Sequence, residues 1–217
     1  MIEIIPSIFA HSQQEFEHKL RLVEHACKMV QVDILDGSLF NNVTWFDAMH
    51  IKALRTPVEY ELHLMVENPL PIIEEWKQHI DQLKRVIVHA ELDRPVGTIL
   101  SHCKERLHLE TAVALNPASP LEEVHAILPH VDQVTLMGVH PGKTGQTFGG
   151  ESILEKIRMV KHHYPEIIVE VDGGVTEKLL ETLAKAGCDR ITATSLLFSF
   201  DNPTERLEYL NNLASTL

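Results

Sequence analysis

Residues 167–174 read Ile-Ile-Val-Glu-Val-Asp-Gly-Gly. A short β-branched run that ends in an acid and two glycines predicts a buried strand that carries a carboxylate to its own tip. The glycines allow backbone to come close to a ligand. Thr176 is expected to cap a helix that ends near Gly187. The gap between strand and helix therefore predicts an anion site beside Asp172, because unpaired N–H groups and the helix dipole both favour negative charge there.

The same alternation of strand and helix runs through the rest of the chain. Strands are predicted at residues 2–5, 29–35, 60–66, 85–89, 108–115, 133–139, 167–172 and 190–193. Helices are predicted between them, with start signals at Ser12, Asn68, Ser119 and Asn202. Eight such units without a linker predict an α/β fold, a closed (β/α)8 TIM barrel that forms one domain over residues 1–217.

An open, doubly wound sheet is the alternative architecture, since one sequence does not reveal the order of strands. Such a sheet would ordinarily show a Gly-x-Gly-x-x-Gly turn after its first strand. This chain has Pro6-Ser7-Ile8-Phe9 at that place, which favours the barrel.

Composition limits the kinds of partner. The chain has 217 residues, 44% of them hydrophobic, so it can bury a full core. It has no run of about 20 apolar residues and no signal-peptide pattern at its start, which predicts a cytoplasmic protein. The net charge of −12 argues against nucleic acid or an anionic membrane, but not against a phosphorylated ligand, because backbone N–H groups can bind phosphate locally. Three widely spaced cysteines are expected to be buried thiols: Cys27, Cys103 and Cys188.

In a barrel, polar side chains at the carboxyl ends of the strands meet on one face. Gln31 and Asp33 share one face of the second strand, and His63 and Met65 share one face of the third. Asp33 and Asp172 lie far apart in strand order, so they can oppose each other across the centre. Two opposed acids suit removal of a proton from a carbon next to a carbonyl and its return from the other side. A divalent cation on His63 and the two aspartates could stabilise the enediolate; the alternative is that both aspartates are structural caps.

Short motifs follow one another in a fixed order along nearly the whole chain. They are Pro6-Ser7, Asp33-Ile34-Leu35-Asp36-Gly37, His63-Leu64-Met65-Val66-Glu67-Asn68-Pro69, His89-Ala90-Glu91, Ala114-Leu115-Asn116-Pro117, His140-Pro141-Gly142 with Gly145-Gln146, and Val171-Asp172-Gly173-Gly174-Val175. Their order and spacing resemble the ribulose-phosphate 3-epimerase family. The resemblance implies a barrel enzyme that interconverts ribulose 5-phosphate and xylulose 5-phosphate, or a related ketose phosphate such as allulose 6-phosphate, and that often forms homo-oligomers.

The resemblance also implies roles for residues. Asp33 would accept the proton and Asp172 would donate it, exchanging roles with the direction of reaction. Asp33, His63 and Asp172 would bind one divalent metal cation of the zinc, iron, manganese or cobalt type. Substrate contacts would come from Ser7, His63, Met65, Gly142, Lys143, Thr144, Gly145, Gly173, Gly174, Thr194 and Ser195.

Four departures from the family pattern concern the site. Thr194-Ser195 stands where the family has Gly-Ser, and His140 replaces an expected Asn or Asp; the other two are at Gln31 and in the phosphate loop. Gln31 stands where the family has a histidine as fourth metal ligand. An amide oxygen suits manganese or magnesium better than zinc or iron, so we expect looser or altered metal binding. Gln31 could instead donate a hydrogen bond to the enediolate. The phosphate loop reads Gly142-Lys143-Thr144-Gly145, in which Lys143 either adds charge or points to solvent.

Three classes of function follow. A sugar-phosphate epimerase with altered metal use is the predicted one, and a paralogue that binds a phosphorylated ligand without turnover is the second. A third class is another barrel chemistry. A Schiff-base aldolase would need a lysine at a strand end, and the related synthases and decarboxylases carry Asp-x-Lys-x-x-Asp. The corresponding Asp33-Ile34-Leu35-Asp36 contains no lysine.

Overall fold

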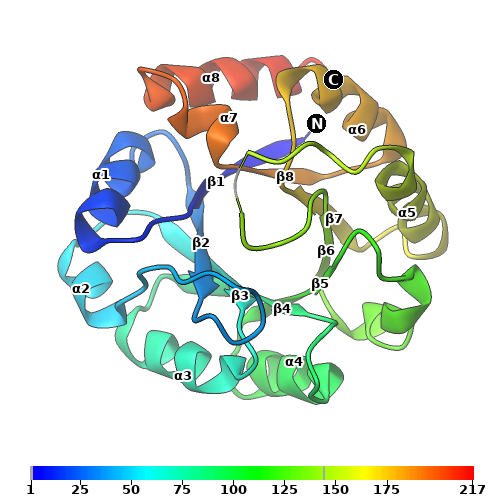
Figure 1. The fold of residues 1–217 in the computed structure, drawn as a ribbon, viewed down its shortest axis with the longest axis horizontal. Coiled ribbons are helices and arrows are strands. Elements are labelled where there is room, and N and C mark those ends of the chain that lie inside the picture. Colours follow the sequence, from blue (N-terminus) through cyan, green and yellow to red (C-terminus); the bar gives the residue numbers. More distant parts are fainter. Residues whose placement is uncertain (1, 144) are drawn as a thin grey trace.

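The structure is a computed structural model that describes residues 2–143 and 145–217. Parallel strands follow one another in sequence order around a closed barrel (Figure 1). The strands are β1 (Glu3–Ile8), β2 (Met29–Leu35), β3 (Glu59–Met65), β4 (Leu83–His89), β5 (Glu110–Leu115), β6 (Gln133–Met137), β7 (Ile168–Asp172) and β8 (Arg190–Ala193). Because β1 pairs with β8, the predicted (β/α)8 barrel is confirmed and the open sheet is excluded.

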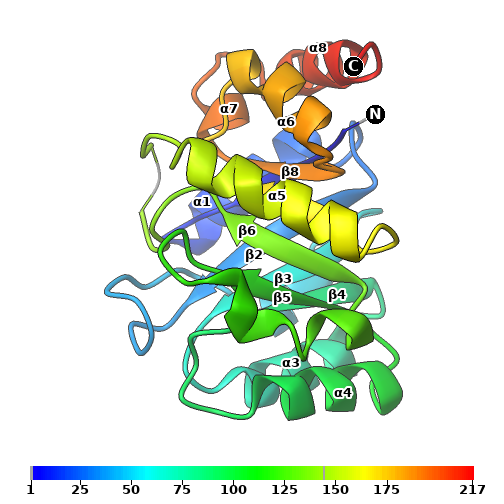
Figure 2. The same ribbon diagram turned by 90° about the vertical axis from the view of Figure 1, so that its right-hand side faces the viewer.

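Helices surround the barrel on the outside (Figures 1 and 2). They are α1 (Gln13–Val23), α2 (Ala48–Ala53), α3 (Pro69–His79), α4 (Val96–Glu105), α5 (Glu151–His163), α6 (Leu180–Ala186), α7 (Ser195–Phe198) and α8 (Pro203–Ala214). Short 3-10 turns add η1 (Leu121–Val124), η2 (Leu128–His130) and η3 (Glu177–Leu179). No helix among the described residues is both long and apolar enough to cross a bilayer.

The alternation of side chains along each strand separates an apolar layer from a polar one. On β2, Val30, Val32 and Ile34 join the large core that packs against helices. Gln31 and Asp33, between them, point into the barrel and bond to side chains of other strands. The main apolar core therefore lies between strands and helices, and much of the barrel interior is left for polar groups.

The first strand is longer than predicted. The sequence predicts its end before Pro6, but β1 continues through Pro6 and Ser7 to Ile8. Residues 3–6 are in register with β8 and residues 7–8 with β2. Pro6 thus lies where the pairing passes from one neighbour to the other, a place that tolerates a residue without an N–H.

Two of the predicted helix starts are confirmed by their hydrogen bonds. The side chain of Ser12 accepts the N–H of Glu15, and that of Asn202 accepts the N–H of Glu205. Asn68 makes no such bond, although α3 begins directly after it.

The prediction of a helix after Ser119 is wrong. Only η1 and η2 form there, and the Ser119 hydroxyl donates to Glu91 instead of capping a helix. Pro129 also lacks the backbone N–H that a continuing α-helix would need. Among the cysteines, Cys103 and Cys188 are buried as expected, whereas Cys27 is only half-buried.

Candidate functional site

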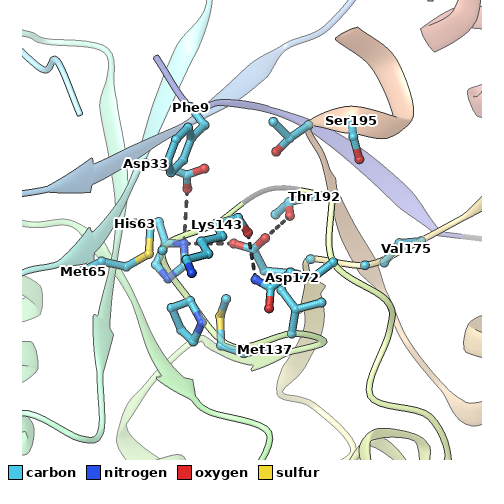
Figure 3. A pocket seen from close by; sticks show the side chains of 18 of the residues that line it. Phe9, Asp33, His63, Met65, Met137, Lys143, Asp172, Val175, Thr192 and Ser195 are labelled. Carbon is cyan, nitrogen blue, oxygen red and sulfur yellow. Dashed lines mark hydrogen bonds and ion pairs between the residues drawn. The ribbon is translucent and has the colours of Figure 1, made fainter. Parts of the chain in front are cut away.

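Two acids and one imidazole meet at the carboxyl end of the barrel (Figure 3). Asp33 comes from β2, His63 is its register partner on β3, and Asp172 ends β7. His63 Nδ1 lies 3.3 Å from Asp33 Oδ1 and 2.9 Å from Asp172 Oδ2. One ligand atom from each of the three residues lies within 4.8 Å of the others, and all three residues are buried. This is a geometry that a metal ion could use.

Gln31 joins the same two acids. Its Nε2 donates to Asp33 Oδ1 at 2.8 Å and to Asp172 Oδ2 at 2.9 Å. Its Oε1 is buried and has no hydrogen-bond partner among the described side chains and backbone. A buried polar atom without a partner costs about 1–3 kcal/mol. Half a turn of the amide would bring Oε1 toward the acids, where it would need a cation or a proton donor.

Two hydroxyl groups hold the outer carboxylate oxygens. Ser7 Oγ donates to Asp33 Oδ2 at 2.7 Å, and Thr192 Oγ1 donates to Asp172 Oδ1 at 2.6 Å. Ser7 is fully buried, so it lies behind Asp33 and does not border the cavity described below. Thr192 was missed in the sequence; its place two residues before Thr194 on an alternating strand was the available signal.

The pKa values in the cluster are shifted by burial and by hydrogen bonding in opposite senses. Burial disfavours the charged imidazole of His63, but its hydrogen bonds to Asp172 and Asp33 outweigh burial and raise its pKa to about 10. Burial alone would raise the pKa of Asp172, yet the hydrogen bonds from His63, Thr192 and Gln31 and the charge of His63 together outweigh burial, and the pKa is lowered. In the absence of a metal cation, His63 is therefore protonated and positively charged between Asp33 and Asp172.

A second histidine lies behind His63. Burial lowers the pKa of His89 to about 4, which leaves this ring neutral. Burial would raise the pKa of Glu91, but hydrogen bonds with His89, Ser119 and the backbone of Asn116 outweigh it and lower the pKa to about 2. The sequence places both His89 and Glu91 in one motif at the end of a predicted strand, without a role for either.

A cavity opens above the cluster. Most of the residues expected to touch substrate border it: His63, Met65, Gly142, Lys143, Gly145, Gly173, Gly174, Thr194 and Ser195. Thr144 lies outside the described residues. Apolar side chains also line it: Phe9, Met137, Val139, Val175 and Leu196.

Glycine is required where the loops after β6 and β7 touch. Gly173 and Gly174 have φ angles of +94° and +70°, which other residues rarely adopt. A Cβ on Gly174 would lie 2.7 Å from the backbone nitrogen of Phe148. Gln146 closes the β6 loop, because its Nε2 donates to the carbonyls of His140 at 2.6 Å and Lys143 at 2.9 Å. The backbones of these two loops therefore pack closely together and form one wall of the cavity.

The helix predicted to begin at Thr176, beside this wall, begins later in the structure. Thr176 makes no capping hydrogen bond through its side chain. The chain first forms the 3-10 turn η3, and α6 begins at Leu180 and ends, as predicted, at Gly187 with φ +99°. Thr194 and Ser195, the first residue of α7, also line the cavity.

The fold and these residues define a class of protein: a (β/α)8 barrel with polar, ionisable groups gathered at the carboxyl ends of its strands, the end where barrel enzymes have their active sites. Solved structures share the fold. A 3-hexulose-6-phosphate synthase from Salmonella typhimurium aligns with TM-score 0.72 at 13% identity over 99% of each chain. An orotidine 5'-monophosphate decarboxylase from Sulfolobus solfataricus aligns with TM-score 0.67 at 11% identity, over 100% of this chain and 99% of the other.

Sequence comparison gives the particular family. The model of the ribulose-phosphate 3 epimerase family matches residues 3–198. A ribulose-phosphate 3-epimerase of Schizosaccharomyces pombe is 31% identical over 97% of this chain and 92% of its own length. One from Chlamydia pneumoniae is 30% identical over 84% of this chain and 81% of its own. The chain belongs to the ribulose-phosphate 3-epimerase family, as its motifs predicted.

Proposed function

We propose that this protein is a sugar-phosphate 3-epimerase that interconverts ribulose 5-phosphate and xylulose 5-phosphate, or a related pair of ketose phosphates. The observation that carries the proposal is the meeting of Asp33 and Asp172, from strands well separated around the barrel, on one imidazole at the floor of the cavity. Residues 1–217 would act as one ribulose-phosphate-binding domain. The expected setting is the cytoplasm, and the expected assembly is a homo-oligomer.

In the proposed reaction the two carboxylates work on opposite faces of the ketose C3. Asp33 removes the C3 proton as general base, and an enediolate forms as the electrons move into the adjacent carbonyl. Asp172 returns a proton to the opposite face, which inverts the centre. His63 Nδ1 lies 2.9 Å from Asp172 Oδ2, so in the absence of a cation the imidazole would supply the proton that Asp172 delivers. In the reverse direction the two acids exchange roles.

The donor groups fit a divalent cation. Two carboxylates and an imidazole converge, and the unpartnered Oε1 of Gln31 offers a fourth ligand after half a turn of its amide. Asp33, His63 and Asp172 would hold the ion, with Gln31 as the weaker ligand. A bound cation would act as a Lewis acid that stabilises the negative charge of the enediolate. The amide oxygen would shift the preference toward harder ions such as manganese or magnesium.

The phosphate would lie against the glycine-rich wall. Backbone N–H groups in such turns bind anions without help from the net charge of the protein. Gly142, Gly145, Gly173 and Gly174 border the same cavity as the acids, and Lys143 adds a cationic side chain to its lining (Figure 3). Apolar Met65 and Met137 would pack against the sugar carbons.

A second candidate is a paralogue that binds a ketose phosphate without turning it over. The observation that favours it is the double hydrogen bond from Gln31 to the two acids, which holds both in the absence of a cation. The two functions differ in hydrogen exchange at C3.

Incubation with ribulose 5-phosphate or allulose 6-phosphate in deuterated water, with and without Mn²⁺, Mg²⁺ or Zn²⁺, tests both. An epimerase incorporates deuterium at C3 and forms the inverted sugar. Saturable binding of the sugar phosphate with no deuterium at C3 under any of these metal conditions would support the paralogue and contradict the epimerase.

A further inference from the structure

A line of hydrogen bonds leads from His63 away from the two acids. His63 Nε2 lies 2.9 Å from Nε2 of His89, at the end of β4. His89 Nδ1 lies 3.1 Å from Glu91 Oε2. Both rings are fully buried, and 18% of the Glu91 side chain is exposed. The line therefore connects the candidate site to the loop beyond β4 without crossing solvent.

The other oxygen of Glu91 is already engaged. Glu91 Oε1 accepts the N–H of Asn116 at 2.7 Å and the hydroxyl of Ser119 at 2.6 Å. The turn that supplies these donors is itself anchored, because Lys156 Nζ donates to the carbonyls of Asn116, Pro117 and Ser119. The carboxylate is thus fixed with its second oxygen, Oε2, facing His89.

The chemistry of the groups sets the direction of these bonds. A carboxylate only accepts, so His89 Nδ1 must carry the hydrogen. The ring of His89 is fully buried and meets one carboxylate, through Nδ1, so we assign it a single N–H there. Its Nε2 then accepts from His63 Nε2–H. The ring planes differ by 15°, and the facing nitrogens are much closer than the ring centres, which are 5.0 Å apart. The rings therefore meet through their edges, as a hydrogen bond requires.

One nitrogen of His63 is left for exchange. With a hydrogen fixed on Nε2, the Nδ1 lone pair faces Asp33 and Asp172 and can take either a proton or a cation. If the bonds ran the other way, Nδ1 would carry the single hydrogen of the neutral ring and could not bind a metal.

We propose that Glu91 is a positioning residue that acts through His89 to keep Nδ1 of His63 available for a proton or a divalent cation. The assignment rests on the proposed function of the site and adds residues to it that touch neither substrate nor cation. Partners behind metal-binding histidines commonly orient the ring and select the nitrogen that binds.

Glu91→Gln tests the direction directly. The amide oxygen would keep the two donors from Asn116 and Ser119, so the amide N–H would face His89 Nδ1. His89 Nδ1 would then accept a hydrogen bond, and His89 Nε2 would donate one to His63. Nitrogen-15 spectra of histidine near neutral pH, assigned with a His89→Gln variant, should show His89 with hydrogen on Nδ1 in the native protein and on Nε2 in Glu91→Gln. Glu91→Asp should restore the native form.

A metal titration gives a second readout. Zn²⁺ affinity measured by calorimetry should fall about 10- to 100-fold in Glu91→Gln. Glu110→Gln, which removes a carboxylate from Arg85 at the other end of the barrel, is the matched control and should leave both readouts unchanged.

Native His89 with its hydrogen on Nε2 would overturn the proposal even if Glu91→Gln did not fold. An unchanged His89 spectrum and Zn²⁺ affinity in a folded Glu91→Gln variant would also overturn it. Neither measurement uses a sugar, so a failure of the epimerase assay leaves this test intact.

Discussion

Two polar layers fill the barrel interior, and they neutralise their acids in different ways. At the amino end, Arg85 pairs with Glu61 and with Glu110, the latter at 2.6 Å, and Arg190 binds Glu3 and Gln133. At the carboxyl end, the side-chain partners of Asp33 and Asp172 among residues 2–143 and 145–217 are the imidazole of His63, the amide of Gln31 and the hydroxyl groups of Ser7 and Thr192.

Under the proposed function, the difference separates a structural layer from a functional one. An arginine keeps its proton in a protein, so the amino-end layer has a permanent balance of charge. The positive charge on His63 is a proton that can leave or be replaced by a cation. Acids that must give and take protons need a partner of this exchangeable kind. The opening of the cavity at the same end gives such exchange a route.

The strongest test of this comparison replaces one acid in each layer on the same strand. Asp172→Asn should abolish epimerisation, a loss of about 10²- to 10⁴-fold or more, because a general acid and base is removed. Ketose phosphate binding should persist, since the glycine-rich wall is untouched. Glu170→Gln is the control, because Glu170 bonds to Thr135 and to none of the site residues, and burial raises its pKa well above its usual range. Full turnover in Asp172→Asn, measured from C3 deuterium exchange, would show that Asp172 is not needed for proton transfer and would contradict a functional role for the carboxyl-end layer.

Arg85→Met should lower the stability of the fold without changing the residues of the candidate site. Removing one partner of a buried ion pair leaves Glu61 unpaired and typically costs about 3–5 kcal/mol of unfolding free energy. Urea denaturation measures the loss. Lys185→Met, in an exposed pair with Glu181, is the control and should change stability little. Equal stability of the two variants would show that the amino-end layer is not held by charge.

Gln31→His should sharpen the contrast between the layers by making the carboxyl-end layer a stronger cation site. We expect Zn²⁺ affinity to rise by about tenfold or more, since even the partners of metal ligands contribute that much. Equilibrium dialysis and elemental analysis provide the measurement. Gln133→His, an amide in the amino-end layer, is the control and should bind no additional Zn²⁺. Unchanged metal content in Gln31→His would count against a cation at this place.

The smallest expected effect is on stability in acid. The pKa of Glu91 is lowered to about 2 in the folded protein, so its contribution to stability is present above its ordinary value of 4.5 and is lost as the pH falls toward about 2. Denaturation midpoints of the native protein and Glu91→Gln should therefore converge across this range. Parallel curves would mean that the Glu91 carboxylate is not held as described.

Residues that depend on local pattern were predictable. The bounds of β2 and β8 agree with the sequence prediction, because their runs of β-branched and alternating residues are uninterrupted. Asp33, His63 and Asp172 were found because barrel topology collects strand ends on one face. Predictions that depended on where a side chain finds its partner failed more often. Ser119 had the pattern of a helix cap, but Glu91, distant in sequence, takes its hydroxyl.

The sequence by itself determined the alternation of strands and helices, the barrel and the acids that meet in it, because periodicity and turn residues act over a few neighbours. Only the tertiary structure decided that Ser7 lies behind Asp33, that Thr192 holds Asp172, and that Gln31 bridges both acids. Such contacts join strands far apart in the chain, and their hydrogen bonds are set by distances that exist only once the barrel has closed.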